Sequence, residues 1–284
     1  MGDVFLSLQA IRTLRYNYPH HDFCLLTRPD VGQLLMACGE ISGFWDIGNN
    51  ALGEMLSNSD SPSLPMLKEF ERCTHVMVWI NHGKRELKQF FQQRGIDEVI
   101  IQSPHDESLA STHVEDRFLE TISPFAQGGP SKRIPLSLST TFVSQNHEIQ
   151  PLLEHESFIL VHPGSGSPHK CVSISLLGKV IHEIRNRFQK HVVIVAGYAE
   201  EDMAKQLKRA VSEDWCSLVS GLNLVALTQL MKQASCYLGN DSGITHLAAV
   251  LGLPTLAFFG PTDPDQWAPR APGVRVLHGP PCHC

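Results

Sequence analysis

The sequence predicts an α/β protein with two Rossmann-like domains, each consisting of a parallel sheet with helices packed on it. Short apolar runs typical of buried strands alternate with longer amphipathic segments in both halves of the chain. This alternation is typical of βαβ units, whose strands form a parallel sheet. The length of 284 residues also corresponds to about two domains.

The first domain is expected over residues 1–135. Val4, Leu8, Ile11 and Leu14 recur at near-helical spacing and predict an amphipathic helix over 4–18, with Asp3 at its N-cap. We expect strands at 23–27, 44–47, 75–80 and 98–102, and helices at 31–38, 84–94 and 112–122. A domain of this type normally opens with a strand, whereas this sequence begins with a helix, so we expect truncation at this end.

The second domain is expected over residues 151–284, after a junction at 128–150 that is rich in Gly, Pro, Ser and Thr. Strands at 158–162, 192–196, 236–239 and 255–259 alternate with helices at 173–188, 200–211, 222–234 and 242–251. The last residues form no closing element, which predicts truncation at this end too. Cys282, His283 and Cys284 lie too close together to form a tetrahedral site alone, and we expect no metal site.

Composition excludes several classes of protein. Lys and Arg total 23 against 29 Asp and Glu, a net charge of −6 that argues against a general nucleic-acid binder. Eight scattered cysteines do not form a disulfide scaffold. The longest apolar stretch, 247–259, is broken by Gly252 and Pro254 and is short for a membrane span. We therefore expect a cytoplasmic protein whose contact with a membrane is at most peripheral.

The loop from His162 to Lys170 joins an expected strand to an expected helix. Its small residues Gly164, Ser165 and Gly166 let backbone N–H groups approach a phosphate, and Lys170 adds a point charge. The loop lacks the Gly-Lys-Ser/Thr triplet of a Walker A motif. A plain strand-to-helix turn with a surface lysine is the alternative.

A second strand-to-helix turn runs from Gly239 to His246. Asp241 can cap the following helix, and Ser242 and His246 lie four residues apart on one face of it. These residues do not form a hydrolase triad, because no separate base is held by an orienting acid. Two such turns after parallel strands converge on one crevice, where a diphosphate binds. A capped helix with a core histidine is the alternative.

Three acidic residues are further candidates. Glu200 and Glu201 follow the second strand of this domain, where a carboxylate can accept hydrogen bonds from ribose hydroxyls. Either acid fits this role, and favourable interaction with the dipole of the following helix is the alternative, which the sequence alone slightly favours. Asp3 is either a helix cap or a general base that accepts a proton during attack by an acceptor oxygen.

In their order and spacing, the motifs resemble those of the bacterial heptosyltransferase-type glycosyltransferases, family 9 of the GT-B enzymes. The resemblance covers nearly the whole chain. It includes Met1-Gly2-Asp3-Val4, Ile11-Arg12-Thr13-Leu14-Arg15, His113-x-x-x-Arg117-Phe118-Leu119, His162-Pro163-Gly164-Ser165-Gly166 with Lys170, Gly239-Asn240-Asp241-Ser242-Gly243-x-x-His246, and Phe259-Gly260-Pro261-Thr262-Asp263-Pro264 with Trp267-x-Pro269-Arg270.

The resemblance implies two domains that face each other across a cleft, with the donor on the second and the acceptor on the first. It implies inverting, metal-independent transfer of a heptose from a nucleotide sugar, typically the ADP sugar, to a lipid-linked saccharide of the lipopolysaccharide inner core, without a cofactor. By position, Asp3 matches the family's catalytic base, and Glu200 or Glu201 its ribose-binding acid. The other residues match donor contacts: Ser165, Gly166, Lys170, Asp241, Ser242, Gly243 and His246.

The sequence departs from the family pattern at two internal positions. Val172 stands where a tryptophan is often found, and no acid follows the strand near Trp79. A catalytically silent nucleotide-sugar-binding relative and a GT-B-like sugar-nucleotide epimerase are the alternatives.

Overall fold

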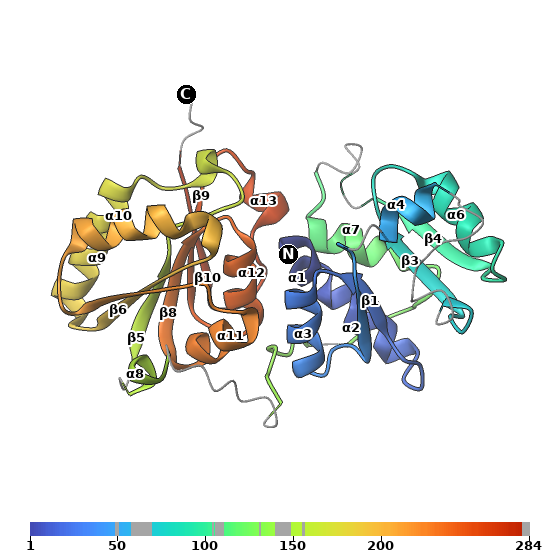
Figure 1. Ribbon diagram of the computed structural model, residues 1–284, viewed down its shortest axis with the longest axis horizontal. Coiled ribbons are helices and arrows are strands. Elements are labelled where there is room, and N and C mark those ends of the chain that lie inside the picture. The colour runs from blue at the N-terminus through green and yellow to red at the C-terminus, as the bar shows by residue number, and fades with distance from the viewer. Residues whose placement is uncertain are drawn as a thin grey trace. The chain divides into compact units, whose positions relative to one another are not determined.

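The computed structural model describes residues 1–48, 51–57, 70–103, 105, 111–130, 132–139, 149–154 and 157–279 (Figure 1). The chain forms two compact units. The N-terminal unit comprises Leu6–Lys132, and the C-terminal unit comprises Arg133–Cys284 together with Met1–Phe5. The stretch 281–284 and parts of the expected junction at 128–150 lie outside the described residues.

The C-terminal unit contains a six-stranded parallel sheet within its described residues. Its strands are β5 (Phe158–His162), β6 (His191–Ala196), β7 (Cys216–Ser220), β8 (Ala234–Asn240), β9 (Thr255–Phe259) and β10 (Val274–His278). They are arranged in the order β10-β9-β8-β5-β6-β7. Counted from β7, this is the doubly wound order 3-2-1-4-5-6, in which the winding direction reverses between β5 and β8. Ligands bind at such a reversal, beyond the carboxyl ends of the strands.

Helices cover both faces of this sheet. Figure 1 shows α9 (Ile174–Phe188) and α10 (Glu201–Val211) on one face and α11 (Leu224–Gln233) and α12 (Gly243–Val250) on the other. The unit also contains α8 (Gln150–Leu153), α13 (Pro264–Trp267) and the 3₁₀ turns η2 (Pro168–Lys170) and η3 (Tyr198–Glu200). Every residue of β5 is buried, as expected for a central strand covered on both faces.

The N-terminal unit contains parallel pairs of strands with helices packed beside them. The strands are β1 (Cys24–Thr27) paired with β2 (Gly43–Asp46), and β3 (His75–Trp79) paired with β4 (Glu98–Gln102). The helices are α2 (Leu8–Asn17), α3 (Pro29–Ala37), α4 (Ala51–Leu56), α6 (Lys84–Gln92) and α7 (Val114–Thr121). Phe70, Phe90 and Phe91 pack edge-to-face in the core beside β3 and β4.

The first helix differs from the prediction. The expected helix over 4–18 is divided at Ser7 into α1 (Gly2–Leu6) and α2. The Val4 amide donates to the Met1 carbonyl at 3.1 Å, so the first turn includes Asp3. Asp3 therefore lies inside the first turn and is not an N-cap. Within the described residues, no helix is both long and apolar enough to cross a membrane.

Candidate functional site

Two strand-to-helix turns meet at the reversal between β5 and β8. His162 ends β5 and pairs with Gly239 of β8, so the chain leaves both strands at the same edge. The Ser165 hydroxyl donates to the Asp241 carbonyl at 2.5 Å, and Lys170 Nζ lies 2.7 Å from Asp241 Oδ2. The structure thus brings together the loop and the turn that the sequence singled out separately.

Lys170 and Asp241 form a partly shielded ion pair. The side chain of Asp241 is 7% exposed and that of Lys170 is 34% exposed. The pair lies near the N-terminus of α12, because Asp241 directly precedes the cap residue Ser242 of that helix. The arrangement is suited to binding an anion, which would interact with both the cation and the amides.

Asn240 is a structural residue of this site that the sequence reasoning did not single out. Its side chain is buried and donates from Nδ2 to the Pro163 carbonyl at 2.6 Å. Its Oδ1 accepts from the Val172 amide at 2.9 Å. Both ends of the 163–172 segment are therefore fastened to the end of β8. An amide side chain at the end of a buried strand is the only signal of this role in the sequence.

The N-terminus of α12 is capped by Ser242, not by Asp241 as expected. The Ser242 hydroxyl accepts from the Thr245 amide at 3.4 Å, whereas the Asp241 carboxylate is occupied by Lys170. Beneath the cap, the Tyr237 hydroxyl lies 3.0 Å from Thr245 Oγ1. Burial raises the pKa of Tyr237 well above its usual value, so the phenol stays neutral.

Two glycines bring the first residues of the chain against α12. A Cβ added to Gly243 would lie 3.1 Å from the Gly2 nitrogen, and one added to Gly2 would lie 3.6 Å from His246 Cδ2. His246 itself is buried. Asp3 directly follows Gly2, which approaches Gly243 and His246. All four residues belong to the C-terminal unit. Asp3 is exposed to solvent.

The two adjacent acids after β6 have different surroundings. The Glu200 side chain lies against the 163–172 segment, since a Cβ added to Gly164 would overlap its Cγ at 2.3 Å. A Cβ on Gly197 would lie 2.8 Å from Glu200 Oε2. Glu201 instead pairs with Lys205 at 2.7 Å, one turn further along α10. Glu200 is therefore the acid at the carboxyl edge of the sheet.

His162 does not contribute positive charge at neutral pH. Burial lowers the pKa of its imidazole to about 4, and its Nδ1 has no hydrogen-bond partner. Gly166, on the same loop, is exposed, with open space where a side chain would stand. Lys170 is therefore the permanent cation of this loop, and it is paired with the Asp241 carboxylate.

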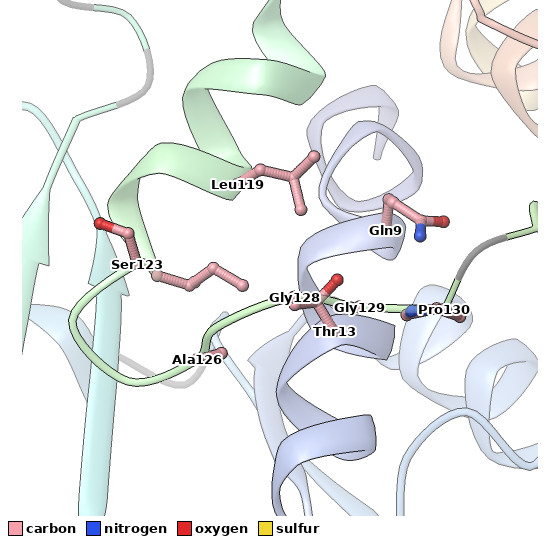
Figure 2. Close-up of a pocket in the computed structure, with 9 residues that line it drawn as sticks. Gln9, Thr13, Leu119, Ser123, Ala126, Gly128, Gly129 and Pro130 are labelled. Atoms are coloured by element: carbon pink, nitrogen blue, oxygen red, sulfur yellow. The ribbon is translucent and has the colours of Figure 1, made fainter.

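A separate pocket of about 320 Å³ lies in the N-terminal unit, between α2, the end of α7 and the segment that follows it (Figure 2). It contains none of the predicted catalytic or donor-binding residues. Its lining is formed by Gln9, Thr13, Leu119, Ile122, Ser123, Ala126, Gly128, Gly129 and Pro130, of which Thr13 and Leu119 belong to the motifs of the family resemblance.

Comparison with solved structures defines the fold as that of the GT-B heptosyltransferases. The chain is similar to the structure of E. coli ADP-heptose lps heptosyltransferase II, with a TM-score of 0.72 and 18% identity over 97% of this chain and 87% of that one. It is also similar to a glycosyl transferase family 9 structure from Veillonella parvula, with a TM-score of 0.78 and 16% identity over 98% and 83% of the two chains.

Comparison of sequences identifies the family. The model of glycosyltransferase family 9 (heptosyltransferase) matches residues 99–282. Lipopolysaccharide heptosyltransferase 3 of E. coli K12 is 22% identical, with 94% of this chain and 82% of that protein covered. The chain belongs to glycosyltransferase family 9, the heptosyltransferase family, and is a glycosyltransferase.

Proposed function

We propose that this protein transfers a heptose from ADP-heptose to a lipid-linked saccharide acceptor of the lipopolysaccharide inner core, with inversion at the anomeric carbon. The observation that carries the proposal is the meeting of the two turns at the β5/β8 reversal, where Ser165 and Lys170 both contact Asp241. The negative charge of a nucleoside diphosphate sugar would be attracted to Lys170 and to the N-terminus of α12. E. coli heptosyltransferase WaaC, a structure of similar fold, was solved with ADP.

The donor would bind along the carboxyl edge of the C-terminal unit. Its diphosphate would contact Ser165, the backbone of Gly166, Lys170 and the amides at the start of α12, including that of Gly243. Glu200 would accept hydrogen bonds from the ribose hydroxyls. Asp241, Ser242 and His246 would hold the diphosphate–sugar junction.

The transfer would be a single displacement in which Asp3 acts as general base. An acceptor hydroxyl forms a bond to the anomeric carbon while the bond from that carbon to the diphosphate oxygen breaks. The hydroxyl proton goes to the Asp3 carboxylate, and the leaving ADP keeps the bond electrons. Lys170 and the α12 amides would stabilise its charge, which is the role a divalent cation has in other transferases. The N-terminal unit would supply acceptor contacts, at the cytoplasmic surface of the membrane.

Calorimetric titration with ADP, UDP, GDP and CDP tests the donor. We expect a clear preference for ADP that is the same with and without Mg²⁺. A preference for UDP or GDP would keep the site and contradict the donor. The absence of binding to a folded chain would contradict the assignment of the site.

Replacing the base tests the chemistry. We expect Asp3→Asn to lower kcat by about 10²- to 10⁴-fold, the usual contribution of general base catalysis, because the amide cannot accept the proton. ADP affinity should stay unchanged, since the diphosphate contacts remain. Asp22→Asn, at an exposed acid of the N-terminal unit, is the matched control. Transfer at the wild-type rate by Asp3→Asn would contradict the role of Asp3. If the wild type changes the configuration of the donor's sugar in the absence of an acceptor, the protein is an epimerase.

A further inference from the structure

Tyr198 is an exposed aromatic residue at the carboxyl edge of the C-terminal sheet. It follows β6 directly, as the first residue of η3, and 83% of its surface is exposed. Isolated exposed aromatic residues are common and need no special explanation. The surroundings of Tyr198 distinguish it, because it lies between Glu200, the candidate ribose-binding acid, and Gly221 at the end of β7.

The Tyr198 ring rests on the backbone of Gly221, the residue after β7. A Cβ added to Gly221 would lie 3.0 Å from ring atoms Cε1 and Cζ and 3.1 Å from the hydroxyl oxygen. Gly221 has a φ of +72°, a conformation that other residues rarely adopt, and its amide donates to the Ala196 carbonyl at 3.0 Å. The turn is therefore held close to β6, and the absence of a side chain at residue 221 leaves room for the ring.

The Tyr198 ring lies at the same carboxyl edge of the sheet as the other candidate donor contacts. Along the edge of the sheet, the anion-binding turns follow β8 and β5, Glu200 follows β6, and the Tyr198–Gly221 contact joins the ends of β6 and β7. Neighbouring strands are about 4.8 Å apart, so β8 to β7 spans about 14 Å. A nucleoside diphosphate laid along this edge has its phosphates at the reversal, its ribose at Glu200 and its base at Tyr198.

We propose that Tyr198 is the platform on which the nucleobase of the donor stacks. This inference rests on the proposed function, because it places the base of the same nucleotide sugar. An aromatic ring offers its face to any base, so Tyr198 supplies affinity and orientation but does not select adenine. Gly221 positions the platform.

Calorimetry on Tyr198 variants tests the platform. Tyr198→Ala is expected to weaken ADP binding by about 5- to 150-fold, the usual range for loss of one base-stacking contact. Tyr198→Phe should bind ADP within about twofold of the wild type, since the ring face is retained. Inorganic pyrophosphate, which has no base, should bind equally to all three proteins. Tyr16→Ala, at an exposed tyrosine of α2, is the matched control and should change nothing.

A second variant tests the role of the glycine. Gly221→Ala should displace the ring and weaken ADP binding while leaving pyrophosphate binding unchanged. Equal ADP affinity of wild type and Tyr198→Ala would overturn the platform and leave the proposed donor intact. Weakened pyrophosphate binding by Tyr198→Ala would also overturn it, because the loss would then come from the neighbouring loop. Absence of ADP binding by the wild type would overturn the proposed donor and the platform together.

Discussion

Glu200 and Glu201 illustrate how neighbouring residues acquire different roles. From the sequence, either acid can bind a ribose, because both directly follow a strand end. The structure separates them, since Glu200 lies against Gly164 and Gly197 whereas Glu201 forms a surface pair with Lys205. That difference depends on the 3₁₀ turn between β6 and α10, which residue types do not indicate.

Glutamine substitutions at these two positions test the assignment. Glu200→Gln is expected to weaken ADP binding about 10-fold or more, because hydrogen bonds to a charged group contribute about 1.5–3 kcal/mol. Glu201→Gln is the matched control and should leave ADP affinity unchanged, since it removes only an exposed ion pair of small energy. A larger effect at Glu201 in isothermal titration would contradict the assignment and favour the other acid.

Residues that hold the site were harder to predict than residues that could touch a ligand. Ser165, Lys170 and Asp241 stand in loops whose composition indicates anion binding. The roles of Asn240, Tyr237 and His162 depend on the β5/β8 register and on burial, neither of which the sequence specifies locally. The cap of α12 was assigned to the wrong residue for the same reason, because Asp241 forms an ion pair with Lys170 of the neighbouring turn.

At the scale of elements, strands with a continuous apolar run were predicted, whether fully buried like β5 or partly exposed like β3, and the two edge strands of the six-stranded sheet were missed. β5 and β6 are almost wholly buried and match the predicted strands closely. The sequence reasoning missed β7 and β10, at the two edges of the six-stranded sheet, where polar and exposed positions interrupt the apolar pattern. The break at Ser7 was missed because apolar spacing continues across it.

The packing of Gly239 and Tyr237 beneath the N-terminus of α12 gives a stability prediction at this scale. A Cβ at Gly239 would overlap the hydroxyl of Tyr237 at 2.2 Å, and that ring is fully buried and hydrogen-bonded to Thr245. Gly239→Ala should therefore lower the free energy of unfolding by about 1–3 kcal/mol, as overpacking does in other cores. Weaker ADP binding should accompany this loss, since Thr245 also contacts the cap residue Ser242.

A glycine elsewhere in the same unit provides the control. Gly178 lies inside α9, and a Cβ there would meet Ala210 Cβ at an ordinary 3.9 Å. Gly178→Ala should raise the free energy of unfolding by about 0.5–1 kcal/mol, because alanine is the better helix former. Urea unfolding measures both variants. A Gly239→Ala protein as stable as wild type would show that the Tyr237 ring is not confined.

At the scale of the whole molecule, the α/β class followed from the alternation of strands and helices, and the family from the order of the motifs. The strand order could not be predicted from alternation alone, because winding in one direction or in two gives the same pattern along the chain. The order β10-β9-β8-β5-β6-β7 places the two candidate turns side by side. The candidate site is therefore a consequence of the topology as much as of the residues.

Binding of the donor diphosphate at the β5/β8 reversal is tested by the ADP affinity of Lys170→Met, compared with the wild type and with Lys179→Met. Lys170→Met removes the cation and leaves the shielded Asp241 carboxylate unpaired. Lys179 is an exposed lysine of α9 and serves as the control. We expect Lys170→Met to weaken ADP binding about 10-fold or more, since a charge-assisted hydrogen bond contributes about 1.5–3 kcal/mol, and Lys179→Met to have no effect. Unchanged ADP affinity in a folded Lys170→Met protein would contradict the claim that the diphosphate binds at the β5/β8 reversal.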